Sequence, residues 1–89
     1  MPSVGYHEPV EDLSIDARDM HRAIVSLAEE LEAIDAYNQR ADVSKDSELN
    51  AILMHNRDDE KEHAAMLLAW IQHKDPSFAT EIKKFLLSE

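Results

Sequence analysis

The chain has 89 residues, nine basic and nineteen acidic, with a formal net charge of −10 and no cysteine. This length fits one small domain, and the lack of cysteine excludes disulfides, zinc–thiolate sites and iron–sulfur clusters. So acidic a surface repels nucleic acid and anionic lipid and attracts cations. No apolar run approaches the roughly 18 residues that a membrane span requires, and the N-terminus lacks the profile of a secretory signal. We therefore expect a cytoplasmic protein with no nucleic-acid or membrane partner.

The sequence predicts a single all-α domain over residues 1–89. The only glycine and two of the three prolines fall at the start of the chain, which favours an extended arm there. Further on, Met20, Ile24, Leu27, Leu31 and Ile34 alternate spacings of four and three, as in a packed helix. The predicted elements are an arm over 1–12 and helices over 13–42, 46–74 and 76–88.

Helix starts have their own signals in the sequence. Ser14 or Asp16 is the expected N-cap of the first helix, and Asp46 or Ser47 that of the second. Asp75 followed by Pro76 is typical of an N-cap and a first helical residue. The expected architecture is an antiparallel two-helix hairpin with a short C-terminal helix.

Each long helix carries an apolar stripe that polar side chains interrupt. At 100° per residue, the first stripe contains Ala23, Leu27, Glu30, Ile34 and Tyr37, and the second contains Leu49, Leu53, Asn56, Glu60, His63, Leu67 and Trp70. A turn centred near Lys45 places Glu30 and Glu60 at equal distances along their helices, roughly 22 Å from the turn. We therefore expect Glu30, Glu60 and His63 to converge within the apolar seam.

Two carboxylates in an apolar seam repel each other and are costly unless a cation or hydrogen bond compensates them. No arginine falls on the stripe at this level, and Lys61 lies about 100° away. Two carboxylates with one imidazole suit Fe²⁺, Mn²⁺ or Zn²⁺. The alternative is a partly exposed Glu–His pair, three residues apart on a charged helix.

Carboxylate-bridged di-iron centres in four-helix bundles use one Glu from each of two helices and Glu-x-x-His from each of the other two. This chain supplies half of that set. Two copies related by a twofold axis would supply all of it, with the metal at the subunit interface, and symmetric dimers are the commonest oligomers. The pattern therefore predicts a dimer that completes a ferritin-like four-helix bundle.

The segments SLAEELEAIDAYNQRAD and LNAILMHNRDDEKEHAAMLLAWI resemble the encapsulated ferritins, half-length ferritin-like proteins carried inside encapsulin nanocompartments. The resemblance covers about residues 7–89. It implies a ferroxidase that oxidises Fe²⁺ to Fe³⁺ with O₂ at a di-iron centre, two ions per dimer, formed by Glu30, Glu60 and His63 of two subunits. It also implies an open ring of dimers, usually a decamer, inside an encapsulin shell that holds the iron mineral in the cytoplasm.

The resemblance extends to three further residues. Glu29 and Glu32 match acidic residues of a family site that attracts iron or other divalent cations, while the residues alone equally fit a solvated acidic face. Tyr37 matches a family tyrosine near the centre, which implies a contact with a ligating carboxylate; core packing is the alternative. Ala36 stands where at least one relative carries Trp. The sequence ends at KKFLLSE without the encapsulation peptide common in the family, so the encapsulin partner rests on the resemblance alone.

Two other functions fit parts of the sequence. A rubrerythrin-like peroxidase shares the EKEHA motif, but its usual rubredoxin module needs four cysteines and this chain has none. A non-enzymatic acidic helical assembly module would contain the same Glu–His cluster incidentally. The remaining histidines, His7, His21, His55 and His73, have no partner at ligand spacing and are expected on the surface or in packing contacts.

Overall fold

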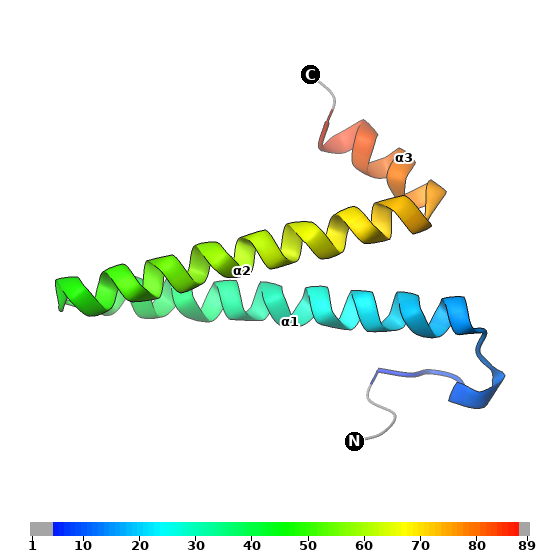
Figure 1. Ribbon diagram of the computed structural model, residues 1–89, viewed down its shortest axis with the longest axis horizontal. Helices are drawn as coiled ribbons and strands as arrows, with labels where there is room; N and C mark the ends of the chain where they lie inside the picture. The colour runs from blue at the N-terminus through cyan, green and yellow to red at the C-terminus, as the bar shows by residue number, and fades with distance from the viewer. Residues whose placement is uncertain (1–4, 88–89) are drawn as a thin grey trace.

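The computed structural model describes residues 5–87, and its regular elements there are all helical. Two long helices, α1 (Ile15–Val43) and α2 (Ser47–Lys74), run antiparallel side by side, and a short helix, α3 (Pro76–Phe85), turns away from the end of α2 (Figure 1). A short 3₁₀ turn, η1 (Val10–Asp12), precedes α1. The predicted fold class is therefore confirmed. The third helix ends at Phe85, earlier than the predicted residue 88, which itself lies outside the described residues, as do residues 1–4 of the predicted arm.

Each α-helix begins at a side-chain cap that the sequence indicates. The caps accept hydrogen bonds from backbone N–H groups three residues on: Ser14 from Ala17 at 3.0 Å, Asp46 from Leu49 at 2.8 Å and Asp75 from Phe78 at 3.0 Å. Pro76 occupies the first turn of α3, where no hydrogen-bond donor is missed. The turn between the long helices is closed by the Asn50 amide, which donates to the Ala41 carbonyl. These local contacts fix the start and register of the hairpin.

The hairpin is a thin layer with little interior of its own. The described chain measures 50 × 42 × 15 Å, and its buried residues are Ala23, Ala64, Ile71 and Ile82. The two alanines belong to the helices of the hairpin, where small side chains allow close approach. Ile82 is the buried residue of α3, which packs on α2. No helix within residues 5–87 has the length and apolar character needed to cross a bilayer.

Part of the predicted seam of the first helix is not buried. Ile24 and Leu31 on α1 are 50% and 55% exposed, and Ile52 and Met66 on α2 are 53% and 64% exposed. A lone hairpin covers only one strip of each helix, so apolar residues beside that strip remain in water. Exposed apolar area of this kind is typical of a surface that packs against another molecule.

The arm folds back along α1. The Tyr6 ring stacks on the His21 ring with centroids 3.9 Å apart, and the Arg18 guanidinium donates to the Val10 carbonyl at 3.0 Å. Gly5 has a φ of 79°, and a Cβ there would lie 3.0 Å from His21 Cε1. Only glycine adopts this backbone conformation readily and fits this close approach. The arm is therefore anchored to the helix at several points.

Candidate metal centre

Glu30, Glu60 and His63 meet in the middle of the hairpin. The helical repeat places Glu60 and His63 one turn apart on the same side of α2. The antiparallel arrangement brings Glu30 of α1 to the same level, so that the ligand atoms of all three residues lie within 4.8 Å of one another. His63 Nδ1 is 3.5 Å from Glu30 Oε2 and 3.7 Å from Glu60 Oε2. Within residues 5–87, this is the group of three whose donor atoms are spaced to hold one metal ion.

The burial of these groups favours a cation between them. The side chains of Glu30 and Glu60 are each 24% exposed, whereas that of His63 is 51% exposed. Glu30 Oε2 is fully covered, and no described donor makes a hydrogen bond to it. An unsatisfied buried acceptor costs about 1–3 kcal/mol, and more when it is charged. A divalent metal would satisfy this oxygen, so the donor set fits a hard or borderline cation.

The cluster is open on one side. His63 is half exposed, so a metal held by these three donors would still face solvent or a second molecule on that side. Three donor side chains are fewer than such a metal ion usually takes, so further ligands would come from another chain or from solvent. The arrangement is therefore suited to binding a reacting metal ion rather than enclosing a structural one.

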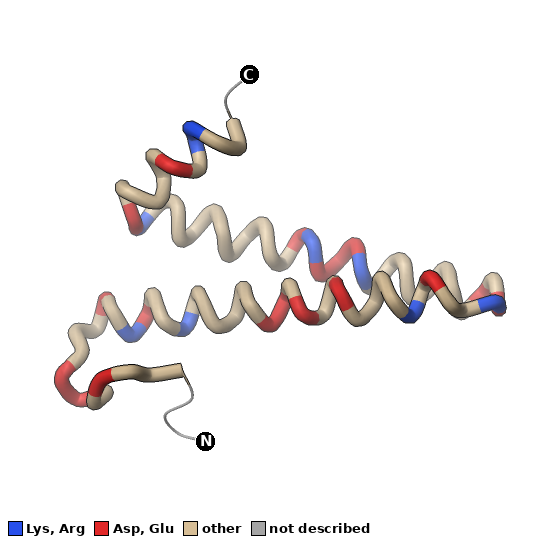
Figure 2. Tube along the Cα trace, turned by 180° about the vertical axis from the view of Figure 1, so that it is seen from behind, with Lys and Arg blue, Asp and Glu red and all other residues tan. Residues whose placement is uncertain are grey.

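The outward carboxylates of α1 do not join this cluster. Glu29 and Glu32 are exposed, as is Asp35, whose carboxylate accepts a hydrogen bond from Gln39. Figure 2 shows acidic residues gathered near the middle of both long helices. This outer group raises the local negative potential beside the cluster.

Tyr37 lies half-buried on α1, and its described ring contact is with Arg40, whose guanidinium carbon is 5.3 Å from the ring centroid. Its contact with a ligating carboxylate remains a prediction. His21 stacks on Tyr6. This is one of the two settings expected for the remaining histidines, namely a packing contact. His55 does have a partner that the sequence analysis missed, because its Nε2 lies 3.3 Å from Asp59 Oδ2, four residues along the exposed side of α2.

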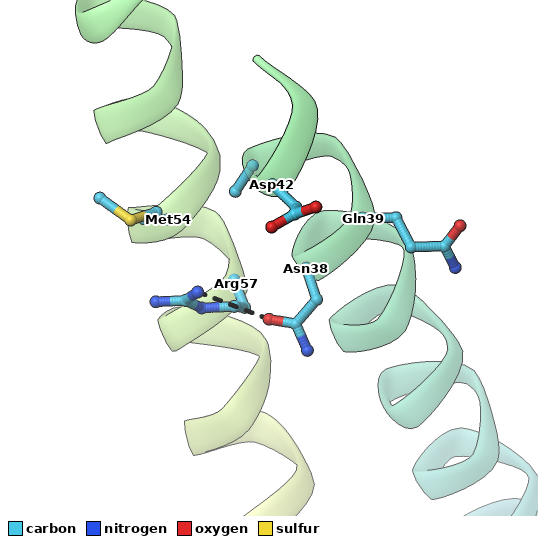
Figure 3. A pocket seen from close by; sticks show the side chains of 6 residues that line it. Asn38, Gln39, Asp42, Met54 and Arg57 are labelled. Carbon is cyan, nitrogen blue, oxygen red and sulfur yellow. Dashed lines mark hydrogen bonds between the residues drawn. The ribbon is translucent and has the colours of Figure 1, made fainter. Parts of the chain in front are cut away.

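A hollow of about 580 Å³ lies nearer the turn and contains none of the three clustered residues (Figure 3). Arg57 of α2 reaches across it and donates to Asn38 of α1 at 3.4 Å. The same arginine hydrogen-bonds Asp58 and, with help from Lys61, holds the pKa of Asp58 below its ordinary value. With an arginine, two amides and one carboxylate in its lining, this hollow has no metal-ligand set. Arg57 was not singled out from the sequence.

A family model described as EncFtn-like matches residues 5–89, and the chain belongs to this family. It is 54% identical over 83 residues to the "Encapsulated ferritin-like protein" of Rhodospirillum rubrum, covering 93% of this chain and 59% of that protein. It is 45% identical over 84 residues to the "Ferritin-like protein" of Thermotoga maritima, covering 94% of this chain and 74% of the relative.

Two further likenesses extend this comparison. The chain is 31% identical over 85 residues to the "Encapsulin nanocompartment cargo protein EncC" of Myxococcus xanthus, covering 94% of this chain and 65% of that one. The structure matches the crystal structure of protein ne0167 from Nitrosomonas europaea with a TM-score of 0.90 and 62% identity, covering 96% of this chain and 93% of that chain. The resemblance to encapsulated ferritins drawn from the sequence is therefore confirmed, although the chain spans only about three-fifths of the Rhodospirillum relative.

Proposed function

We propose that the chain is a ferroxidase. Two copies pair about a twofold axis, so that Glu30, Glu60 and His63 of each hold two Fe²⁺ ions between the subunits. The observation that carries this proposal is the cluster itself, with a covered Glu30 oxygen that has no hydrogen-bond donor and an imidazole on its open side. The exposed apolar side chains of the single hairpin support pairing, because a second hairpin would bury them.

The residues supply a simple division of roles. Glu60 of each copy would be shared between the two sites, while Glu30 and His63 would complete the protein ligands of each Fe²⁺ substrate. Each Fe²⁺ substrate would lose one electron, so that two ions reduce O₂ with two protons from solvent to hydrogen peroxide, and four ions reduce it with four protons to two molecules of water. Carboxylate oxygens are hard ligands that favour the ferric product over the ferrous substrate. The exposed Glu29 and Glu32 attract incoming Fe²⁺ or other divalent cations.

The names of two relatives indicate where those proteins are found. One is called encapsulated and another an encapsulin nanocompartment cargo protein. We extend this to the present chain as cargo of an encapsulin shell, in which rings of dimers, decamers by family resemblance, oxidise iron for storage.

The test is the rate of Fe²⁺ oxidation in air, followed by ferric absorbance, for the parent protein and for His63→Ala. His73→Ala is the matched control, because His73 is exposed in the last turn of the same helix. We expect fast oxidation in the parent and the control and a loss of more than about 10-fold in His63→Ala. Equal slow rates in all three proteins would reject the ferroxidase.

Two further measurements distinguish the ferroxidase from the two alternative functions, a peroxidase and a non-enzymatic assembly module. Faster turnover with hydrogen peroxide than with O₂ would favour the rubrerythrin-like peroxidase. Metal ligands that join two chains should couple iron binding to association, which native mass spectrometry measures directly. No effect of Fe²⁺ on oxidation or on oligomer mass would favour the assembly module.

A further inference from the structure

Met66 lies beside the open side of the metal-ligand cluster. It follows His63 by three residues on α2, and residues three apart on a helix are surface neighbours with Cβ atoms about 5–6 Å apart. At about 100° per residue, His63 is turned about 60° from Glu60 around the helix, and Met66 about 60° further in the same direction. Met66 is 64% exposed, and the His63 side chain is 51% exposed. A small molecule that leaves the cluster through its open side therefore passes close to the Met66 thioether.

The other described methionines, Met20 and Met54, lie away from this opening. Met20 is half-buried on α1. Met54 is 39% exposed on α2, but it lines the hollow near the α1–α2 turn (Figure 3). Nine residues separate it from His63, about 14 Å along the helix, and it is turned about 120° from Glu60 in the direction opposite to His63. Met54 and Met66 therefore have the same chemistry on the same helix and differ in their position relative to the cluster.

The side of α2 that carries His63 also exposes apolar side chains. Ile52, which is 53% exposed, is turned about 80° from Glu60 in the same direction as His63 and Met66. In the proposed pair, the second subunit supplies its ligands at the open side of the cluster and so covers this side of α2. Met66 thus lies beside the metal and within the surface that pairing buries.

We propose that Met66 is an oxidation site, where hydrogen peroxide formed at the metal centre is consumed and the pair is weakened as a result. This rests on the proposed function, which supplies the peroxide when two Fe²⁺ ions reduce O₂. The Met66 sulfur attacks one peroxide oxygen, and the S–O bond forms as the O–O bond breaks. The proton on the transferred oxygen goes to the departing hydroxide to give water. Sulfur loses two electrons and the peroxide gains them, so no further reactant is needed.

The sulfoxide changes the character of the pairing surface. Methionine is a flexible apolar side chain that fills gaps between packed surfaces, whereas its sulfoxide is polar and disrupts such contacts. Because the second subunit completes the metal centre, a weaker pair oxidises Fe²⁺ more slowly. Peroxide that accumulates at the centre therefore lowers the activity that produces it. Reduction of the sulfoxide back to the thioether restores the apolar surface.

The first test measures which methionine is oxidised during turnover. The full-length protein oxidises Fe²⁺ in air with catalase present to destroy released peroxide, and peptide mass spectrometry gives the ratio of sulfoxide at Met66 to sulfoxide at Met54. The reference is the same ratio for Zn²⁺-loaded protein treated with added hydrogen peroxide, in which the cluster holds a metal without iron chemistry. We expect the turnover ratio to exceed the reference ratio by at least about 10-fold, because peroxide forms next to Met66.

The outcomes of this test separate the oxidation site from the ferroxidase. Equal ratios would overturn the proposal, because Met66 would then react as any exposed methionine does. Fast Fe²⁺ oxidation without sulfoxide at Met66 would also overturn it and leave the ferroxidase standing. Fe²⁺ oxidation no faster than in buffer would reject the ferroxidase and, with it, this proposal.

A second test measures the effect on pairing. Met66→Gln places a polar side chain of similar length at this position and should weaken the Zn²⁺-loaded pair by at least about 10-fold in native mass spectrometry. Met54→Gln, the matched change outside this surface, should alter pairing by less than about 2-fold.

Met66→Leu removes the thioether and keeps an apolar side chain. Over repeated additions of Fe²⁺, this variant should retain its own initial rate, while the parent protein loses a few-fold of its rate. Equal effects of the two Gln substitutions on pairing, or equal losses of rate in the parent and Met66→Leu, would contradict the proposed effect of Met66 oxidation on the pair.

Discussion

Glu29 and Glu30 are neighbours on α1, yet the structure places them in opposite environments. Glu30 faces α2, is 24% exposed and shares its space with Glu60 and His63. Glu29 faces away from this cluster and is exposed, together with Glu32 and Asp35. The two residues have the same chemistry and the same helix around them. What differs is the direction in which each side chain points from the helix. A carboxylate that points inward loses water and is stabilised by a bound cation, whereas one that points outward stays hydrated and only attracts cations.

The same contrast holds on α2. Asp58 faces outward, where Arg57 donates to it at 3.2 Å and Lys61 approaches to 3.5 Å. Glu60, two residues further, faces inward, where its described ion-pair contact is the imidazole of His63 at 3.7 Å. Outward carboxylates are therefore satisfied by neighbours and solvent, while inward ones form a set whose charge is incompletely balanced. We frame the following predictions as tests of that difference.

The largest effect is expected on metal binding. Glu30→Gln removes one charged donor of the cluster without changing side-chain size and should weaken Co²⁺ binding, followed by its visible absorbance, by roughly 10–100-fold. Glu29→Gln makes the same chemical change one residue away and should alter the affinity by less than about 3-fold. Similar losses in the two variants would show that total charge, rather than the inward cluster, binds the metal.

The same substitution should have a smaller effect on the stability of the protein without metal, and this effect should be a gain rather than a loss. Glu30→Gln relieves the repulsion between two partly buried carboxylates and introduces a donor near Glu60, so it should stabilise the fold by about 1 kcal/mol. For a chain of this size that corresponds to a rise in Tm of about 4–8 °C. Differential scanning calorimetry with a chelator present, at one fixed protein concentration, measures it. A lower Tm than the parent would mean that the cluster is already satisfied without metal.

The outward pair should affect the rate at which metal arrives. Replacing Glu29 and Glu32 together by Gln lowers the negative potential near the cluster and should slow Fe²⁺ capture in stopped flow by a few-fold at low salt. The difference should shrink at physiological salt, where charges beyond about 8 Å are screened. A rate loss independent of salt would instead indicate that one of these residues ligates the metal.

The smallest effect is expected on the pH dependence of stability and comes from Asp58, which faces outward. Its folded-state pKa is lowered, so the stabilisation from its charge is present above the unfolded pKa of about 3.9 and is lost as the pH falls through the folded value. Asp58→Asn should therefore reduce Tm slightly at pH 6, and this difference should shrink as the pH falls below about 3.9 and vanish below the folded-state pKa. A difference that grows on acidification would mean that the carboxylate is not stabilised in its charged form.

Much of this arrangement follows from local rules in the sequence. Helix periodicity and three capping residues, Ser14, Asp46 and Asp75, define the hairpin and the start of α3. Counting residues from the turn brings Glu30 and Glu60 to one level, because both helices rise by the same amount per residue. The meeting of these carboxylates with His63 was predictable for that reason.

Other features depend on contacts between distant segments and were not predictable. The return of the arm along α1 depends on the stacking of Tyr6 on His21, which no spacing rule indicates. Likewise, the periodicity places Ile24 and Leu31 on a packed stripe, but it does not say which neighbour covers them, and α2 does not. The direction of α3 depends on its packing against α2, a tertiary contact, and Ile82 is the buried residue of α3.

The 15 Å thickness of the described chain has a consequence for how its sequence tolerates change. In a globular domain, tolerance to substitution increases from the centre outward. In a layer this thin, sensitivity to substitution should instead repeat along the sequence, because about two residues in every seven on each long helix point toward the other helix. The two outer faces of the layer should be sensitive as well where they contact other molecules. A saturation mutagenesis map of this chain should therefore show periodic bands along the sequence, and some of its least tolerant positions should be ones that a single subunit exposes to water.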